Sequence, residues 1–162
     1  MDPVESNLSP DDVLVTLLCP QDAALLVRFF TENRLEFFEN AVSDPKKYIE
    51  DYLSSYSKRC IAAFEMKGRS GGRSVVAFAN IDVWARPRGG KIAYLGEVYV
   101  DARWRRKGIA SRLVTALVEE AARLGCHRII LHCRPDAMAI YQKTGFSEWE
   151  RGMCLNLVVR TL

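Results

Sequence analysis

Apolar residues recur along the chain at two spacings, and the spacing separates expected strands from expected helices. Short apolar runs rich in β-branched or aromatic residues, bounded by Gly, Pro or polar residues, are typical of strands. They predict strands at 13–19, 60–66, 74–85, 91–100, 128–133 and 154–159. Glycine-rich turns join the second, third and fourth of these strands, which are therefore expected as antiparallel neighbours.

Spacings of three and four residues predict helices between these strands. The expected helices lie at 21–33, from about 36 with a restart after Pro45, at 109–124 and at 135–144. At the restart, Ser43 or Asp44 can cap the helix, and Pro45 fits the first turn, where a missing N–H costs nothing. The long helix is expected to end at Gly125.

The order of these elements predicts the fold class. A strand, an amphipathic helix and another strand form a crossover unit, which normally places its two strands parallel. The expected fold is therefore α/β, with a mixed, predominantly antiparallel sheet, helices on both faces and the order β-α-α-β-β-β-α-β-α-β. We expect residues 1–12 to be a flexible N-terminus and 13–162 a single domain, since 162 residues with 49% hydrophobic content suit one core.

Two features of the sequence bear on location. No apolar run approaches the roughly 20 residues needed to cross a bilayer, and the first twelve residues lack the basic start and apolar stretch of a signal peptide. We expect a cytoplasmic protein with no membrane partner, and a nuclear location stays open.

The cysteines predict neither disulfides nor a metal site. They are odd in number and scattered, mostly within apolar runs, so they are expected to be reduced and buried. The five are Cys19, Cys60, Cys126, Cys133 and Cys154. The stretch "CHRIILHC" holds four potential metal ligands, but neighbouring side chains of a strand point to opposite faces, so His132 and Cys133 could not share one ion without distortion.

Positive charge gathers on one short turn. The chain carries a net charge of +3, whereas residues 101–112 hold five cations against Asp101. Nucleic-acid binders spread basic charge over a face or a helix, because affinity grows with the number of phosphates neutralised, so no nucleic-acid partner is expected. The turn "WRRKG" precedes a helix, whose first N–H groups favour an anion, and Gly108 would let the backbone approach a phosphate or pyrophosphate.

The same turn fills the pattern Arg/Gln-x-x-Gly-x-Gly/Ala with Arg105, Gly108 and Ala110. It has neither the three glycines of the dinucleotide fingerprint nor the Gly-Lys-Ser/Thr of a P-loop. The pattern lies in "EVYVDARWRRKGIASRLV" and is followed by "IILHCRPDAMAIYQKTGF". In these motifs and in its element order, the chain resembles the GNAT superfamily of acetyl-CoA-dependent N-acetyltransferases.

The resemblance implies that acetyl-CoA binds where the fourth and fifth sheet strands separate. The pantetheine arm is expected along the fourth strand, and the pyrophosphate on the turn and the helix start. The residues concerned are Val98, Tyr99, Val100, Arg105, Arg106, Lys107, Gly108, Ile109, Ala110 and Ser111. Arg134 departs from the family, whose members commonly carry a small polar residue there.

Glu97 and Tyr141 are the expected catalytic residues. A lysine-like amine with a pKa of ~10.4 is almost wholly protonated at pH 7, so a base must accept its proton. Glu97 interrupts an apolar strand and is the candidate base, the alternative being that it faces solvent. The resemblance matches Tyr141 to a tyrosine near the cofactor sulfur, whereas the pattern alone favours a core aromatic. A backbone N–H near Val98 could polarise the acetyl carbonyl.

The acceptor is expected to bind among the first two helices and the hairpin loops. Aromatic side chains that could wall this site are Phe37, Phe38 and Trp84, although core positions are equally expected for the first two. Acidic side chains that could attract a cationic amine are Glu36, Glu39 and Asp82.

The function that these features favour is direct acetyl transfer, within a ternary complex, to the primary amine of a small molecule. One alternative acceptor is a protein N-terminus or a lysine, which would need an open groove. Another alternative is a module that binds acetyl-CoA without catalysis. The sequence leaves open whether the chain forms a homodimer.

Overall fold

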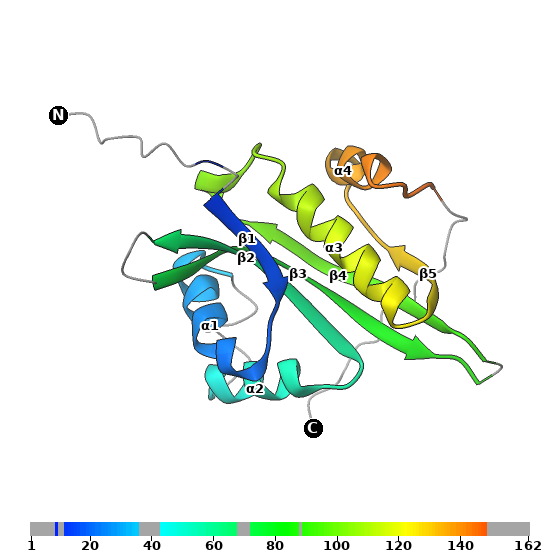
Figure 1. The fold of residues 1–162 in the computed structure, drawn as a ribbon, viewed down its shortest axis with the longest axis horizontal. Coiled ribbons are helices and arrows are strands. Elements are labelled where there is room, and N and C mark those ends of the chain that lie inside the picture. The colour runs from blue at the N-terminus through cyan, green and yellow to red at the C-terminus, as the bar shows by residue number, and fades with distance from the viewer. Residues whose placement is uncertain (1–8, 10–11, 36–42, 68–71, 88, 149–162) are drawn as a thin grey trace, which may run out of the picture.

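The computed structural model describes residues 9, 12–35, 43–67, 72–87 and 89–148. Within them lies a five-stranded sheet in the order β1-β2-β3-β4-β5 (Figure 1). The strands are β1 (Val13–Leu17), β2 (Lys58–Lys67), β3 (Gly72–Ala85), β4 (Lys91–Val100) and β5 (Cys126–Leu131). The helices are α1 (Ala23–Glu32), α2 (Pro45–Ser54), α3 (Ile109–Arg123) and α4 (Met138–Lys143).

This arrangement confirms the expected fold class. β1 to β4 are antiparallel neighbours, and β5 runs parallel to β4 after the α3 crossover. The Asp44 side chain caps α2 by accepting a hydrogen bond from the Lys47 N–H at 3.0 Å, and α3 ends just before Gly125. The expected strand at 154–159 and the helical start at 36–42 lie outside the described residues.

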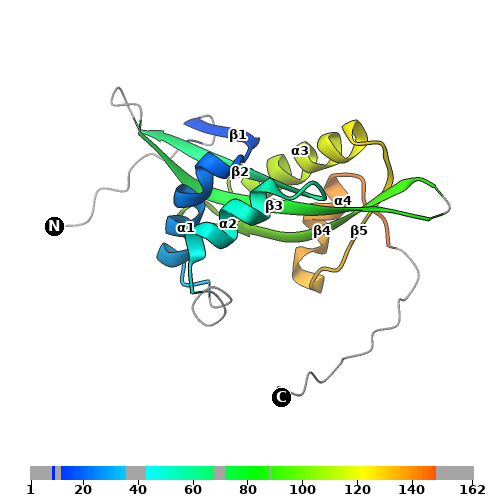
Figure 2. The same ribbon diagram turned by 90° about the horizontal axis from the view of Figure 1, so that it is seen from below.

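Helices cover the two faces of the sheet and divide the core (Figures 1 and 2). On one face, α3 packs its apolar stripe, including Leu113 and Leu117, against the sheet strands. On the other face, Phe29 and Phe30 of α1 pack against Phe78 of β3 with edge-to-face ring geometry. The sheet therefore separates an α3 side from an α1/α2 side, and each side has its own cluster of buried apolar residues.

The cysteines differ from one another in exposure. Cys60 is buried, and Cys126 and Cys133 are partly buried, all as free thiols. Cys19 is exposed, so the expectation of burial is wrong for this residue. β1 ends at Leu17, and Cys19 therefore lies after the strand rather than within it. Cys154 lies outside the described residues. Within the described part of the chain, no group of three or more His, Cys, Asp or Glu side chains could hold a metal ion. No helix in that part is long and apolar enough to cross a membrane.

β4 carries a bulge midway along its pairing with β3. Ala79 of β3 pairs with Val98 of β4. Two residues further along β3, Ile81 pairs with Leu95, which is three residues back on β4, so β4 holds one extra residue. Leu95 and Val98 consequently both face the α3 side, whereas Glu97 lines the α1/α2 side. In a regular strand Glu97 would share the face of Leu95.

The side chain of Asn80 holds this bulge in place. Its Oδ1 accepts a hydrogen bond from the Glu97 N–H at 2.9 Å, and the residue is only 8% exposed. Gly96 leaves the room that Asn80 needs, because a Cβ at position 96 would lie 2.8 Å from Asn80 Nδ2 and 3.2 Å from its Oδ1. The dipeptide Gly96-Glu97 is thus matched to one polar side chain on the neighbouring strand.

Gly96→Ala should lower the free energy of unfolding by about 1–3 kcal/mol, because the added methyl overpacks the site. Asn80→Ala should also destabilise, since it removes the partner of the Glu97 N–H. In urea denaturation, the double variant should lose less than the sum of the single variants by about 1 kcal/mol, because Gly96→Ala meets no Asn80 side chain there. Additive losses would contradict the proposed contact.

Candidate active site

β4 parts from β5 halfway along its length. Their parallel pairing ends at Leu95 and Leu131, so residues 96–100 of β4 extend beyond it. The parting begins at the bulge, since Gly96 and Glu97 are the first residues past the last registered pair. One edge of β4 therefore has no β5 partner over the stretch that leads into the basic turn.

Backbone hydrogen bonds give the direction of the polar groups on this edge. The Asp101 N–H donates to the Val76 carbonyl of β3 at 2.9 Å. Because successive N–H groups of a strand point to alternate edges, those of Val98 and Val100 point away from β3. Arg105 Nε donates a hydrogen bond to the Val100 carbonyl at 3.0 Å. The β4 edge is thus suited to pair with an extended, amide-bearing ligand arm.

A buried acid anchors the turn that follows β4. Asp101 is 7% exposed, accepts a hydrogen bond from the Arg103 N–H at 2.9 Å, and accepts two more from the Arg103 guanidinium. These bonds hold the pKa of the Asp101 carboxyl below its usual value. Trp104, 2% exposed, inserts into the core on the α3 side. The turn is therefore fixed at its start, and its remaining residues lie at the beginning of α3.

The backbone at the start of α3 adopts left-handed conformations. Arg106 has a φ of 63° and Gly108, the N-cap, a φ of 75°. An added Cβ at Gly108 would meet no protein atom within 4 Å, so the backbone is open on that side. The first N–H groups of α3, those of Ile109 to Ser111, have no intrahelical acceptor by geometry and point out of the helix end. Such an end attracts an anion such as a pyrophosphate.

The structure distinguishes the cations of the turn. Arg103 pairs with Asp101, and the Arg112 guanidinium donates to the Val13 carbonyl at 2.7 Å, which ties α3 to β1. Arg105 is bonded to β4 and lies 5.6 Å from the Tyr99 ring. Arg106 is exposed beside Gly108. Several of these cations therefore make bonds that stabilise the turn. The backbone N–H groups at the start of α3 are consequently the main candidates for binding an anion.

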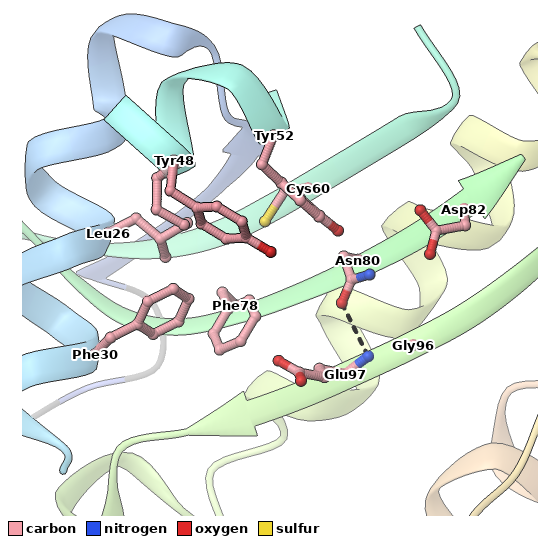
Figure 3. A pocket seen from close by; sticks show the side chains of 11 residues that line it. Leu26, Phe30, Tyr48, Tyr52, Cys60, Phe78, Asn80, Asp82, Gly96 and Glu97 are labelled. Atoms are coloured by element: carbon pink, nitrogen blue, oxygen red, sulfur yellow. Dashed lines mark hydrogen bonds between the residues drawn. The ribbon is translucent and has the colours of Figure 1, made fainter. Parts of the chain in front are cut away.

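A pocket of about 280 Å³ lies on the opposite face, between α1, α2 and the middle of the sheet (Figure 3). Its lining combines apolar, aromatic and acidic side chains. The lining residues are Leu26, Phe30, Tyr48, Ile49, Tyr52, Cys60, Phe78, Asn80, Asp82, Gly96 and Glu97. The bulge therefore belongs both to the pocket and to the open edge of β4.

Glu97 enters this pocket because of the bulge. Its side chain lies beside Asn80 and Phe78 (Figure 3), and the residue is exposed to solvent. Partial burial of the carboxyl raises the pKa of Glu97 above its usual value. A raised pKa makes a carboxylate a better proton acceptor, and the remaining exposure gives the proton a route to water.

The neighbours of Glu97 were only partly foreseen. Asp82 accepts a hydrogen bond from Lys58 Nζ at 2.7 Å, and Lys58 also lies 4.8 Å from the Tyr52 ring. Burial, with smaller contributions from nearby negative charges, raises the pKa of the Tyr52 hydroxyl. Asp82 was expected at the acceptor site, whereas Asn80 was missed. The signal for Asn80 was a second polar residue at strand spacing within the apolar run "VVAFANIDVWA".

Tyr141 lies on the other side of the sheet. It belongs to α4, which packs beside α3 (Figure 1), and its ring meets Phe146 edge-to-face with centroids 5.9 Å apart. Burial, and to a lesser extent Cys133, raises the pKa of its hydroxyl. Glu97 and Tyr141 therefore belong to opposite faces of the sheet, Glu97 to the pocket and Tyr141 to the cluster that contains α3.

The expected aromatic walls of the acceptor site lie elsewhere or outside the described residues. Trp84 is 51% exposed and stacks on Tyr94, with centroids 5.9 Å apart and rings 3° from parallel. It follows Asp82 on β3 but does not line the pocket. Phe37 and Phe38, like Glu36 and Glu39, lie outside the described residues. A role for any of these residues in acceptor binding stays a prediction.

Part of the chain is similar in sequence to known N-acetyltransferases. The chain is 45% identical over 60 residues to a probable glucosamine 6-phosphate N-acetyltransferase of Oryza sativa subsp. japonica, which covers 37% of this chain and 36% of the relative. It is 38% identical over 76 residues to an L-amino acid N-acetyltransferase of Escherichia coli (strain K12), covering 44% of this chain and 46% of that protein. These matches span less than half the length of either relative.

Solved structures share the fold over nearly the whole chain. An aminoglycoside acetyltransferase from an uncultured soil metagenomic sample, in complex with trehalose, superposes with a TM-score of 0.75 at 16% identity, covering 93% of this chain and 99% of that one. Glucosamine-6-phosphate N-acetyltransferase from Arabidopsis thaliana gives a TM-score of 0.70 at 19% identity, covering 90% and 99%.

The sequence profile of one family spans the elements that build the site. It matches residues 26–146, from α1 through the bulge, the basic turn before α3 and α3 itself to the end of α4. That stretch is about three quarters of the chain. The protein belongs to the acetyltransferase (GNAT) family.

Proposed function

We propose that the protein is an N-acetyltransferase that moves the acetyl group of acetyl-CoA directly to the primary amine of a small molecule. One observation carries the proposal: the β4 bulge belongs both to the pocket and to the open strand edge that leads into the basic turn. An amine in the pocket and an acyl donor on the edge would therefore meet at residues 96–98. Family membership and the N-acetyltransferase names of the relatives support the same activity.

The described residues fit acetyl-CoA, which supplies the acetyl group as a thioester. The Val98 carbonyl and the Val100 N–H, which point away from β3, would pair with the amides of the pantetheine arm. The backbone from Arg105 to Ala110, with Ser111, would hold the pyrophosphate at the positive end of α3. The open space around Gly108 supports this assignment, since a side chain there would stand where the anion approaches.

Glu97 would accept the proton that the attacking amine must lose. The raised pKa of the Glu97 carboxyl lies closer to neutral pH than the usual value does. Because the side chain is exposed, water can relay the proton. The Val98 N–H, on the open edge of β4, would donate a hydrogen bond to the acetyl oxygen as negative charge develops there.

Tyr141 would donate a hydrogen bond to the departing sulfur. A cysteine-like thiol has a pKa of ~8.5 against ~10 for tyrosine, so full proton transfer from Tyr141 is already uphill by roughly 2 kcal/mol. Burial raises the pKa of Tyr141 further, which widens that difference. The hydroxyl therefore contributes as a hydrogen-bond donor, and solvent completes the protonation.

The pocket supports a small molecule rather than a protein as the acceptor. Its volume of about 280 Å³ is bounded on one side by α1 and α2, through Leu26, Phe30 and Ile49. A lysine or an N-terminus within a protein would need an open groove that also admits the flanking chain.

Gly108→Val should weaken acetyl-CoA binding in calorimetry by about tenfold or more, a loss of ~1.4 kcal/mol, whereas Arg106→Ala should weaken it only a few-fold. The reason is that the backbone at Gly108 forms the anion site and a branched side chain would cover it. Gly89→Val is the matched control, because Gly89 also has a positive φ, of 90°, and an added Cβ there also meets nothing within 4 Å. Equal losses in both valine variants would contradict the assignment.

Glu97→Gln should lower kcat/KM at neutral pH by roughly 10²-fold or more, the usual contribution of a general base. In the wild-type enzyme, kcat/KM should fall as the pH drops through the raised pKa of Glu97, since only the carboxylate accepts a proton. The variant should lose this limb and regain activity at alkaline pH, where the amine is deprotonated by solvent. An unchanged pH profile in the variant, with intact acetyl-CoA binding, would rule out the base.

Tyr141→Phe should lower kcat by roughly 10- to 150-fold, because a hydrogen bond to a charged group is worth about 1.5–3 kcal/mol. The affinity for acetyl-CoA and the melting temperature should change little, since the ring and its contact with Phe146 remain. Steady-state kinetics under saturating acetyl-CoA measure the effect. Wild-type turnover in this variant would exclude the hydroxyl from the reaction.

A further inference from the structure

The pocket on the α1/α2 side has two carboxylates on its strands and an apolar end at α1. Asp82 of β3 and Glu97 of β4 lie on either side of Asn80, with Glu97 next to Phe78 (Figure 3). Leu26 and Phe30 of α1 provide part of the apolar end. An ammonium group placed near Glu97 would therefore leave the rest of its molecule among hydrocarbon side chains.

The apolar end is lined mainly by aromatic rings, together with the Cys60 thiol. Phe30 and Phe78 meet edge-to-face with centroids 4.8 Å apart, and Tyr48 and Tyr52 reach towards the strands from α2 (Figure 3). Burial raises the pKa of the Cys60 thiol to about 12, so it stays protonated and acts as part of the apolar lining. Rings with these faces and edges favour a flat apolar body and a nearby cation.

The charges around the pocket disfavour an anionic acceptor. Among the described lining residues two are carboxylates and none is Lys, Arg or His. Lys58 is the neighbouring cation, and its Nζ is held by Asp82 at 2.7 Å and by the Tyr52 ring. Arg59, next along β2, pairs with Glu120 of α3, on the other face of the sheet. A phosphate or carboxylate buried here would lose its hydration without gaining a partner.

The pocket is also compact. Its volume of about 280 Å³ falls at the lower limit of small-molecule sites, which usually measure about 300–1,000 Å³. Tyr48, 50% exposed, borders solvent. The site therefore suits a short molecule whose amine reaches Glu97 and whose body fills the aromatic end.

We infer that the acceptor is a primary amine on a compact apolar body, of the arylalkylamine type, without a carboxylate or phosphate. This inference rests on the proposed function and specifies its acceptor. It sets the chain apart from an enzyme for a phosphorylated amino sugar or for an amino acid, since either substrate carries an anionic group that the described lining does not bind.

Two pairs of amines that differ only in the anionic group test the inference. Phenethylamine and phenylalanine differ by a carboxylate, and glucosamine and glucosamine 6-phosphate differ by a phosphate. Thiol release and mass spectrometry of the product should show kcat/KM for phenethylamine above that for phenylalanine by about 10²-fold, or ~2.8 kcal/mol. Glucosamine 6-phosphate should be no better than glucosamine, and both should fall below phenethylamine. Preference for either anionic amine would overturn the inference and leave acetyl transfer standing.

A binding measurement separates the acceptor from the chemistry. Calorimetric titration of the protein with phenethylamine and with phenylalanine, without acetyl-CoA, should show the same preference. Selective binding of phenethylamine with no turnover of any amine would support the acceptor and refute the transferase. A protein that neither binds nor acetylates phenethylamine would refute the acceptor, and the transferase would be refuted with it only if none of the four amines is acetylated.

Asp82→Asn tests the electrostatic cause. Releasing Lys58 from Asp82 should let its ammonium pair with a carboxylate, so the kcat/KM ratio of phenylalanine to phenethylamine should rise by about tenfold. Asp51→Asn is the matched control, because it removes the same charge from an exposed ion pair with Lys47 on α2 and should leave the ratio unchanged. An unchanged ratio in Asp82→Asn, or an equal rise in the control, would overturn the role assigned to the Lys58–Asp82 pair.

Discussion

The hydrogen bond from the Glu97 N–H to the Asn80 side chain is the interaction on which the site depends. It holds one extra residue in β4, and that residue moves Glu97 from the face of Leu95 to the face of the pocket. The bulge also lies where β4 leaves β5, so the edge of Val98 to Val100 begins at the same point. Without the bulge, a carboxylate would be directed into the α3 core, which has a high free-energy cost unless it is paired.

The sheet acts as a partition between two chemical environments. On the α3 side, Asp101 and Trp104 fix a turn whose backbone can take an anion. On the α1/α2 side, aromatic and acidic side chains form a compact pocket. Between them lies a single strand edge, so two ligands could bind on separate surfaces and still bring their reactive groups together. This geometry suits direct transfer within a ternary complex.

The sequence predicted the elements well where local chemistry specifies them. The 91–100 strand has the expected bounds, α3 begins after Gly108 and ends before Gly125, and Asp44 caps α2, because β-branched runs, helical spacing and capping residues act locally. The bulge escaped prediction, since it depends on Asn80 of a different strand. The structural bonds of Arg105 and Arg112, made to the β4 and β1 backbones, were equally invisible in a count of charges.

The Lys58–Asp82 pair has an evolutionary consequence. It joins two strands at the rim of the pocket and contacts neither the β4 edge nor the turn before α3. A single substitution at either residue would change the net charge beside the pocket, while the β4 edge and the turn before α3 stay the same. Under the proposed function, exchange of a few residues on β2 and β3 could therefore change the choice of acceptor without altering the donor site.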